Sequence, residues 1–336
     1  MAEVSRTQPP GPEAGPDSPT QLSRRSWWTA LKKTATEFNE DNAWDWAAAL
    51  TYYGVLSIFP GLLVLVSIVG MVRRESIQPM IDNLAGVAPG AVRSILNEAV
   101  TGLQEAKDRA GLVAAIGLAV ALWSASGYVA AFMRASNAAY DVPEGRPIWK
   151  TIPIRIGITV TAGVLLVLSA AIVVITGDLA AAVGRALGLE SATVAVWNVG
   201  KWPVLVVLVG LLFALLYWAS PNARQGGFRW VSPGGALAVL LWVVASLLFG
   251  LYAANFASYD ETYGTLAGVV VFLVWLWISN LALLLGLELD AELERQRAVA
   301  AGHPPGQEPY LRQRDDRAAG KHTEQGLGET PGARGV

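Results

Sequence analysis

Residues 264–287 read GTLAGVVVFLVWLWISNLALLLGL, a run without a single charged side chain. An α-helix needs about 20 mainly apolar residues to cross about 30 Å of hydrocarbon, and this run is long enough. Lipid offers no hydrogen bonds to backbone N–H and C=O groups, so a segment that crosses it is expected to be helical. The run therefore predicts a transmembrane helix.

Five more such runs precede it, at residues 47–72, 111–133, 154–176, 202–219 and 233–256. Charged residues make up only 15% of the chain, against about 25% in a typical soluble domain, and they gather between and outside the runs. The pattern predicts an all-α polytopic membrane protein, with a six-span membrane domain at 26–297. The polar ends, 1–25 and 298–336, are expected to be disordered tails.

Two segments outside the spans have helical periodicity. Trp27, Leu31 and Phe38 lie on one face of a short helix, which either rests on the membrane surface or packs on the protein itself. In 73–110, two apolar stripes flank a Pro-Gly breaker, which predicts an amphipathic helical hairpin between the first two spans. The hairpin either caps the bundle or shields an opening in it.

The distribution of basic residues predicts the orientation. Of the 25 Lys and Arg residues, 17 lie in 1–46, 134–153, 220–232 and 288–336, all on one side of a six-span topology. Seven lie on the other side, among them Arg73 and Arg74 directly after the first span. Because cytoplasmic segments carry the excess of Lys and Arg, both termini are expected in the cytoplasm.

Several kinds of chemistry are excluded by composition and motifs. The chain has no cysteine, and its two histidines, His303 and His322, lie in the polar C-terminal tail. Disulfides, thiolate chemistry and histidine metal sites are therefore not expected in the membrane body. The sequence contains no nucleotide-binding P-loop, no G-x-S-x-G elbow and no basic groove interleaved with aromatic residues. We expect no cofactor, no metal and no nucleic-acid partner.

Five motifs stand out along the chain: DWAAALTYY at 45–53 with Phe59-Pro60, LWSAS at 122–126 with NAAY at 137–140, Pro221-Asn222 with Trp230 and Pro233-Gly234, NFASY at 255–259 with TYG at 262–264, and LGLELDAEL at 285–293. In this order they resemble the motifs of the YihY/BrkB family of bacterial membrane proteins. The last motif departs slightly from the family's usual Ala-Glu-Leu-Asn, at Leu287 and Asp290. The resemblance covers roughly residues 30–297.

This resemblance implies a six-span protein of the bacterial plasma (inner) membrane. Members of the family have been named ribonuclease BN, a label now regarded as mistaken, and a serum-resistance virulence factor. Some have been proposed to export lipids or other solutes. The family supplies no agreed active site, so candidate residues are taken from this chain alone.

Polar side chains in or beside the spans are the candidates for a binding cavity, because burying them in lipid is costly. Arg134, which closes the second span, either holds an anionic group such as a lipid phosphate or anchors the helix at the interface. Pro60 is expected to kink the first span and open space in the bundle. The predicted cavity residues are Tyr52, Tyr53, Arg134, Asn137, Asn255 and Glu288.

Acidic residues near the cytoplasmic ends of the first and sixth spans predict an ion-pair cluster. Its candidate members are Asp41, Asp45, Arg155, Asp290 and Glu292. For Asp45 and Glu288 the alternative is a role in binding protons or substrate. Two ordinary pairs on the helix surface are also expected, Glu292 with Arg295 and Glu294 with Arg297.

The leading hypothesis is a transporter-like or lipid-handling protein with no enzymatic activity. Its partners would be membrane lipids and an anionic lipid or small solute, and without an ATP site active transport would need an ion gradient or an energised partner. The alternative is an envelope scaffold that recruits partners through its tails. A membrane-embedded hydrolase or ribonuclease has the least support.

Overall fold

The computed structural model describes residues 15–71, 110–174, 191–256 and 265–318. Within these ranges it leaves aside the side chains of 59–71, 110–116, 174, 191–195, 228–232, 253–256 and 265–267. The predicted hairpin at 73–110 falls almost entirely outside the described residues.

The described residues form helices and connecting segments, with one isolated β-bridge between Ala223 and Gln313 as the sole extended pairing among them. A short 3-10 helix, Pro19–Gln21, comes first. The α-helices are α1 (Arg24–Glu40), α2 (Ala43–Met71), α5 (Ala110–Ala139), α6 (Ile148–Val174), α8 (Ser191–Ala219), α9 (Phe228–Phe256) and α11 (Thr265–Ala300). The all-α prediction is confirmed for the described part of the chain.

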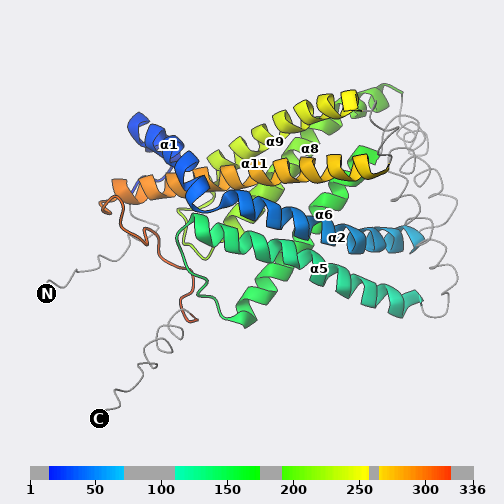
Figure 1. The fold of residues 1–336 in the computed structure, drawn as a ribbon, viewed down its shortest axis with the longest axis horizontal. Helices are drawn as coiled ribbons and strands as arrows, with labels where there is room; N and C mark the ends of the chain where they lie inside the picture. The colour runs from blue at the N-terminus through cyan, green and yellow to red at the C-terminus, as the bar shows by residue number, and fades with distance from the viewer. Residues whose placement is uncertain (1–14, 72–109, 175–190, 257–264, 319–336) are drawn as a thin grey trace, which may run out of the picture.

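Six of these helices form a closed ring. The contacts run from α11 to α2, α5, α6, α8 and α9 in turn, and α9 packs against α11 to close the circuit. In Figure 1, α11, α2 and α5 run along the long axis, and both chain ends emerge at the same end of the molecule. We call this end, which includes α1 and the segments 140–147, 220–227 and 301–318, the tail end.

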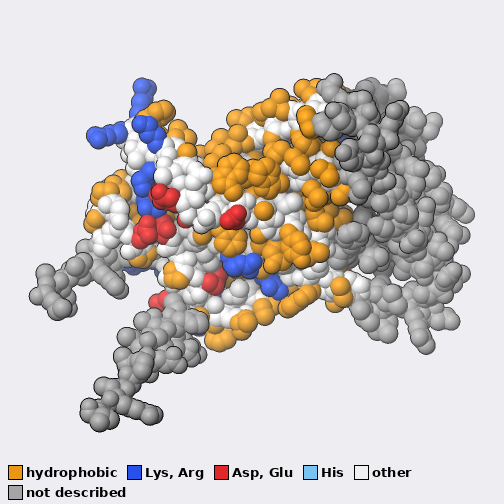
Figure 2. Space-filling model, in the orientation of Figure 1, with side chains coloured by type: hydrophobic (Ala, Val, Ile, Leu, Met, Phe, Trp, Pro, Cys, Tyr) orange, Lys and Arg blue, Asp and Glu red, His pale blue; other side chains and the backbone are white. Residues whose placement is uncertain are grey.

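The outer surface of the ring is apolar. Val199, Leu247 and Leu251 are between 65% and 73% exposed, an arrangement that water would disfavour and lipid accepts. Figure 2 shows apolar side chains over the middle of one face, while most charged side chains gather at the tail end. The ring therefore has the surface of a protein whose solvent is the bilayer.

Five helices are long and apolar enough to cross a membrane: the candidate spans are Gly117–Ala139, Ile148–Val173, Val196–Ala219, Pro233–Tyr252 and Gly268–Ala300. These match the second to sixth expected spans. The first expected span, 47–72, falls on α2, a helix of 29 residues whose described side chains end at Ile58. Pro60 lies within α2, and its side chain is outside the described residues.

Helix α1 packs on the protein through one face. The hydroxyl of Ser23 caps it by accepting a hydrogen bond from the Ser26 backbone N–H at 3.0 Å. Ala30, Thr34 and Phe38 are buried, and α1 contacts α11 more extensively than α2. Of the two interpretations of this segment, packing on the protein is the one that the structure shows.

The boundaries of both predicted tails differ from the structure. At the N-terminal side, Leu22 is buried and α1 begins at Arg24, inside the expected tail at 1–25. At the C-terminal side, α11 continues to Ala300, and residues 301–318 pack against the ring with Tyr310 and Leu311 each 1% exposed. Both segments are ordered by apolar contacts with residues that are distant in the sequence.

Candidate functional site

The last turns of α11 carry an arginine that serves as a hub. The Arg295 guanidinium lies 2.9 Å from a Glu292 oxygen and donates a hydrogen bond of 2.6 Å to Asp141, in the segment after α5. It also lies 3.5 Å from a Glu308 oxygen and 4.0 Å from Glu37 on α1. One cation thus joins four parts of the chain, and its position over the Tyr310 ring, 4.7 Å from the centroid, adds a cation–π contact.

Carboxylates outnumber cations around this hub. The acidic cluster consists of Glu37, Asp41, Asp141, Glu288, Glu292 and Glu308. Against these six stand Arg295 and Lys33, which pairs with Glu37 at 3.3 Å. Glu288 is only 3% exposed, and its Oε2 has no hydrogen-bond partner among the described residues. A buried carboxylate oxygen without a partner is costly, and because carboxylates crowd around few cations, the members of the cluster outside the spans are expected to hold protons more tightly.

Two members outside the spans show this effect directly. Burial, reinforced by the neighbouring Asp141 and Glu37, raises the pKa of Asp41 to about 7. Burial also raises the pKa of Asp141 to about 6, although Arg295 acts in the opposite direction. Both carboxyls therefore titrate near neutral pH, whereas an exposed aspartate titrates near 4.

Amides join the other helices at the tail end. Asn137, at the end of α5, donates to Glu144 at 2.9 Å and accepts a 2.7 Å hydrogen bond from the Asn222 backbone N–H after α8. Glu144 also binds Arg146 through two hydrogen bonds of 2.7 Å, and this hydrogen bonding keeps the pKa of Glu144 below its usual value despite its burial. Asn137 is thus a structural connector of two segments.

The segment 301–318 closes this end of the ring. Arg314 donates to the backbone oxygens of Trp218 and Ala223, at 2.6 and 2.8 Å. The Asn222 side-chain amide donates a hydrogen bond of 2.8 Å to the Asp315 backbone oxygen and accepts one of 3.1 Å from the Asp315 backbone N–H. The segment therefore binds the C-terminal end of α8 and the 220–227 connection, and it is a fixed part of the fold.

Helices α9 and α11 make their closest approach at two glycines. A Cβ atom built on Gly286 would overlap the backbone oxygen of Gly234, and one built on Gly234 would overlap that of Gly286. One turn further along α11, Asp290 accepts a 2.6 Å hydrogen bond from the Gly234 backbone N–H. Glycine at both positions allows the contact, and the Asp290 carboxylate satisfies a donor in the first turns of α9.

The predicted cavity residues do not converge. Tyr52 is 61% exposed, and its ring makes an edge contact with Tyr53, 5.4 Å between centroids. Arg134 is exposed and lies over Trp46 at 6.0 Å, an arrangement that suits an interfacial anchor. Glu288 lies in the acidic cluster and Asn137 in the amide network; the side chain of Asn255 lies outside the described residues.

The residues of the predicted ion-pair cluster lie in different places. Asp41 and Glu292 belong to the acidic cluster, but Asp45 is exposed in the first turn of α2, and Asp290 binds the backbone of α9 instead. Arg155 lies apart from the cluster, on α6, with its guanidinium over the Trp123 ring of α5 at 4.9 Å. The expected Glu292–Arg295 and Glu294–Arg297 pairs both form, at 2.9 and 2.6 Å, but they are buried and not on the surface.

A cavity of about 400 Å³ lies inside the ring. Five helices line it: α2 through Gly54 and Ser57, α5 through Tyr128, α6 through Thr159 and Gly163, α8 and α11 through aliphatic and Phe side chains. Near it, Tyr128 donates to Asn280 at 2.9 Å, and Asn280 donates to Thr51 at 3.0 Å, so a hydrogen-bonded chain crosses from α5 through α11 to α2. The volume falls within the range of about 300–1,000 Å³ that is usual for small-molecule sites.

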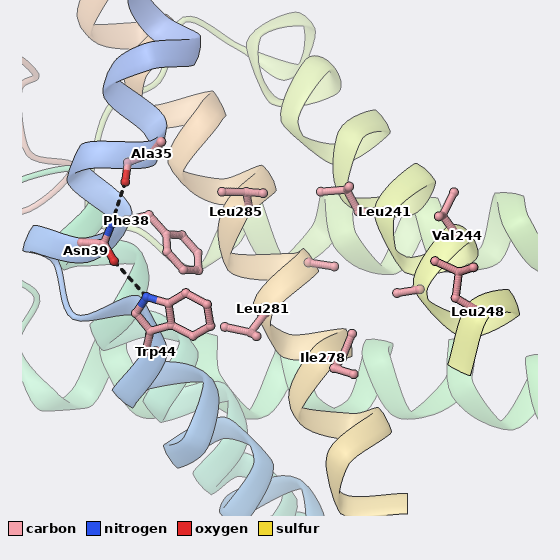
Figure 3. Close-up of a pocket in the computed structure, with 12 residues that line it drawn as sticks. Ala35, Phe38, Asn39, Trp44, Leu241, Val244, Leu248, Ile278, Leu281 and Leu285 are labelled. Carbon is pink, nitrogen blue, oxygen red and sulfur yellow. Dashed lines mark hydrogen bonds between the residues drawn. The ribbon is translucent and has the colours of Figure 1, made fainter. Parts of the chain in front are cut away.

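A second hollow is a groove of about 480 Å³ between α1, the start of α2, α9 and α11 (Figure 3). Leu285 on α11 and Leu241 on α9 face each other across it, and Leu281 lies beside Trp44. At its rim Trp44 donates to the Asn39 side chain and Asn39 donates to the Ala35 backbone oxygen, both at 2.9 Å. The groove is therefore an apolar surface whose polar rim is already hydrogen-bonded.

Sequence reasoning missed several residues of the tail end, notably Arg295 as a hub, Tyr310 and Asp315. It also gave no role to Asn222, Gly234 and Gly286, which lie in motifs that had been singled out. The available signal was the motifs themselves: NAAY, Pro221-Asn222, Pro233-Gly234 and LGLELDAEL all meet at the tail end. Short polar motifs at the ends of several spans indicate a shared contact.

The apolar ring and its five candidate spans define the class of protein, a multi-pass integral membrane protein. A family model described as "Virulence factor BrkB" matches residues 34–310, most of the chain. The chain is therefore a member of the BrkB family, as the motifs led us to expect.

Curated relatives agree with this membership. The ribonuclease-like protein YfkH of Bacillus subtilis is 28% identical over 83% of this chain and 98% of its own length. A UPF0761 membrane protein of Alkalilimnicola ehrlichii is 28% identical over 80% of this chain and 60% of its own, and IL2447 of Idiomarina loihiensis is 28% identical over 79% and 90%. No solved structure matches the chain.

Proposed function

We propose that this chain is a six-span plasma-membrane protein that binds and transports an apolar or amphipathic molecule through the cavity inside its helix ring. The observation that carries the proposal is the 400 Å³ cavity, which is lined by five helices from distant parts of the sequence. A protein that served only as a scaffold would gain nothing from an unfilled interior, since empty space costs packing energy.

The membrane topology is part of this proposal. The one span that is missing from the five candidates would be α2, which occupies the ring position between α11 and α5. The excess of Lys and Arg at the tail end favours a cytoplasmic location for both termini. Because the chain has no cysteine, a single Thr20→Cys or Ser191→Cys substitution gives a specific label. An impermeant maleimide added to intact spheroplasts should label Ser191→Cys alone; labelling of Thr20→Cys there would reverse the orientation.

We also propose that the chain is not an enzyme. The name of the Bacillus subtilis relative refers to a ribonuclease, which would need a site for catalysis in contact with water. In the described residues no group of three or more His, Asp or Glu side chains is arranged to hold a metal ion. Support for a hydrolase is thus limited to the name of a relative.

Two glycines on α6 provide a direct test of the cavity. Gly163 lines the cavity and Gly157 does not, and in both a Cβ atom would meet nothing within 4 Å. Gly163→Phe should therefore fill the cavity, while Gly157→Phe is a control of equal size on the same helix. We expect native mass spectrometry from lipid nanodiscs to show a discrete bound molecule on wild type and Gly157→Phe, and its loss from Gly163→Phe. The same unselective lipid on all three would refute a binding cavity.

A further inference from the structure

Arg155 is a charged residue within a membrane span, where a charge is energetically costly. It lies two turns into α6, within the candidate span Ile148–Val173. A charge inside a span is costly unless an opposite charge, a hydrogen-bond acceptor or water compensates it. The compensation that the structure shows for Arg155 is therefore informative.

That compensation is incomplete. The guanidinium lies over the ring of Trp123 at 4.9 Å, a cation–π contact that compensates a buried charge only in part. Its Nε is buried and has no hydrogen-bond partner, and among the described residues no carboxylate forms an ion pair with it. Arginine offers five N–H donors in a planar fork that fits a carboxylate or a phosphate, so an anion is the missing partner.

Arg155 lies on the same face of α6 as residues that line the interior cavity. Thr159, Ala162 and Leu166 line that cavity, at positions i+4, i+7 and i+11 from Arg155, so all four share one face of α6. The Thr159 hydroxyl donates to the Arg155 backbone oxygen at 2.7 Å, one helical turn away. The long side chain of Arg155 thus begins one turn outside the cavity wall.

The cavity itself has no spare hydrogen-bond donor among its hydroxyl groups. The hydroxyl of Ser57 donates to the Gly54 backbone oxygen, that of Tyr128 to Asn280, and that of Thr159 to Arg155. The rest of the lining is aliphatic or phenyl. An apolar chain fits such a lining, and a charged group does not.

We propose that Arg155 binds the anionic head, a carboxylate or a phosphate, of an amphiphile whose apolar chain occupies the cavity. Trp123 of α5 supports the guanidinium through the cation–π contact. This assignment rests on the proposed function and names its substrate class. It also separates Arg155 from Arg134, whose side chain lies exposed at the tail end over Trp46.

The test uses oleate and oleyl alcohol, which share a chain and differ in the charge of the head. Wild type, Arg155→Gln and Arg155→Lys in phosphatidylcholine nanodiscs are titrated with each probe and read by native mass spectrometry. We expect oleate to bind at least about tenfold more weakly to Arg155→Gln, with an intermediate affinity for Arg155→Lys and no change for oleyl alcohol. Lys32→Gln, which removes another cation that lies over a tryptophan, Trp28, is the control for charge.

A second arm identifies the source of the anion. Nanodiscs that contain phosphatidylglycerol show whether a lipid phosphate is retained by wild type and lost from Arg155→Gln, whereas the oleate arm reports a free carboxylate. Unchanged oleate and phosphatidylglycerol binding in both Arg155 variants would overturn the assignment. Gly163→Phe distinguishes the two proposals: if it leaves binding of oleyl alcohol intact, the cavity and the proposed function fail, whatever Arg155 does. If Arg155→Gln does not fold, the Lys variant carries the test.

Discussion

The tail end and the interior of the ring are built from the same helices on opposite principles. At the tail end, charged side chains are buried and joined to one another: Arg295 contacts four carboxylates and Asn137 bridges two segments. In the interior, aliphatic side chains leave about 400 Å³ unfilled, and Arg155, on the same face of α6 as part of the lining, has no anionic partner among the described residues. Buried polar contacts therefore fix how the helices assemble at the tail end, whereas the middle of the ring contains free space.

The largest effect is expected at the hub. Arg295→Met leaves four carboxylates without their shared cation, and removing one partner of a buried ionic group typically costs about 3–5 kcal/mol. The midpoint of thermal unfolding in detergent should fall steeply. Lys33→Met is the control, since Lys33 pairs with a single glutamate and is 41% exposed, so its loss should cost less than about 1 kcal/mol. Equal shifts for the two variants would contradict the hub.

The next largest effect concerns the C-terminal segment. Tyr310 is 1% exposed and its hydroxyl contacts the Ala291 backbone oxygen at 3.3 Å, so Tyr310→Ala should cost about 3 kcal/mol by leaving a cavity. The exposed Pro304→Ala should change stability little. Thermal unfolding measures both. A disordered tail, as the sequence suggested, predicts no effect for either substitution.

A glycine pair sharpens the contrast between the two regions. Gly286→Ala forces a Cβ into the backbone of α9 and should destabilise the protein by about 1–3 kcal/mol. Gly163→Ala places the same atom where nothing lies within 4 Å, and the gain in helix propensity should leave stability equal or up to about 1 kcal/mol higher. Unfolding midpoints measured side by side decide the matter. If Gly163→Ala were the more damaging variant, the interior would be tightly packed.

The smallest effect is a dependence on pH. The folded pKa of Asp41, about 7, lies above its ordinary value of 3.8, so the folded state binds more protons than the unfolded state between these values. The free energy of unfolding should therefore fall as pH rises from about 4 to 7, with the full penalty above pH 7. Asp41→Asn should remove it and be more stable than wild type by about 1 kcal/mol at pH 8, a figure reduced for solvent screening of a half-buried group. The exposed Asp45→Asn is the control, and parallel pH profiles for all three proteins would sink the idea.

The helices were predictable because the length of an apolar run is a local property. Their ends were not. The apolar run of the sixth span was expected to end at Leu287, and the helical pairs expected beyond it reached Arg297, whereas α11 continues to Ala300. The charges continue the helix because Arg295 and Arg297 pair one turn back along it, and because α1 and Tyr310 cover them. Burial of this kind depends on partners that lie distant in the sequence.

For the candidate site, the sequence predicted only how deep each residue lies in the membrane. Sequence position shows how far a residue lies from a membrane boundary, and it grouped Asp41 with Glu292, which share the neighbours Glu37, Asp141 and Arg295. It gives no direction around the helix ring. Arg155 was assigned to the acidic cluster for its depth, but the ring places it against α5, facing Trp123. The hypothesis of an anion at Arg155 depends on knowing which helices are neighbours in the ring, and the sequence does not give that.

That closure has a consequence for synthesis. Leu22 and Ala30, near the start of the chain, share a buried cluster with Leu289 and Leu293 near its end. At about 5–20 residues per second, the ribosome needs on the order of ten to fifty seconds to produce α11 after α1. During this interval α1 lacks its main packing partner, and α9 and α2 lack the helix that joins them. We predict that a nascent chain arrested before Thr265 exposes α1 to protease and that release of the full chain protects it; protection before α11 emerges would show that the ring assembles in another order.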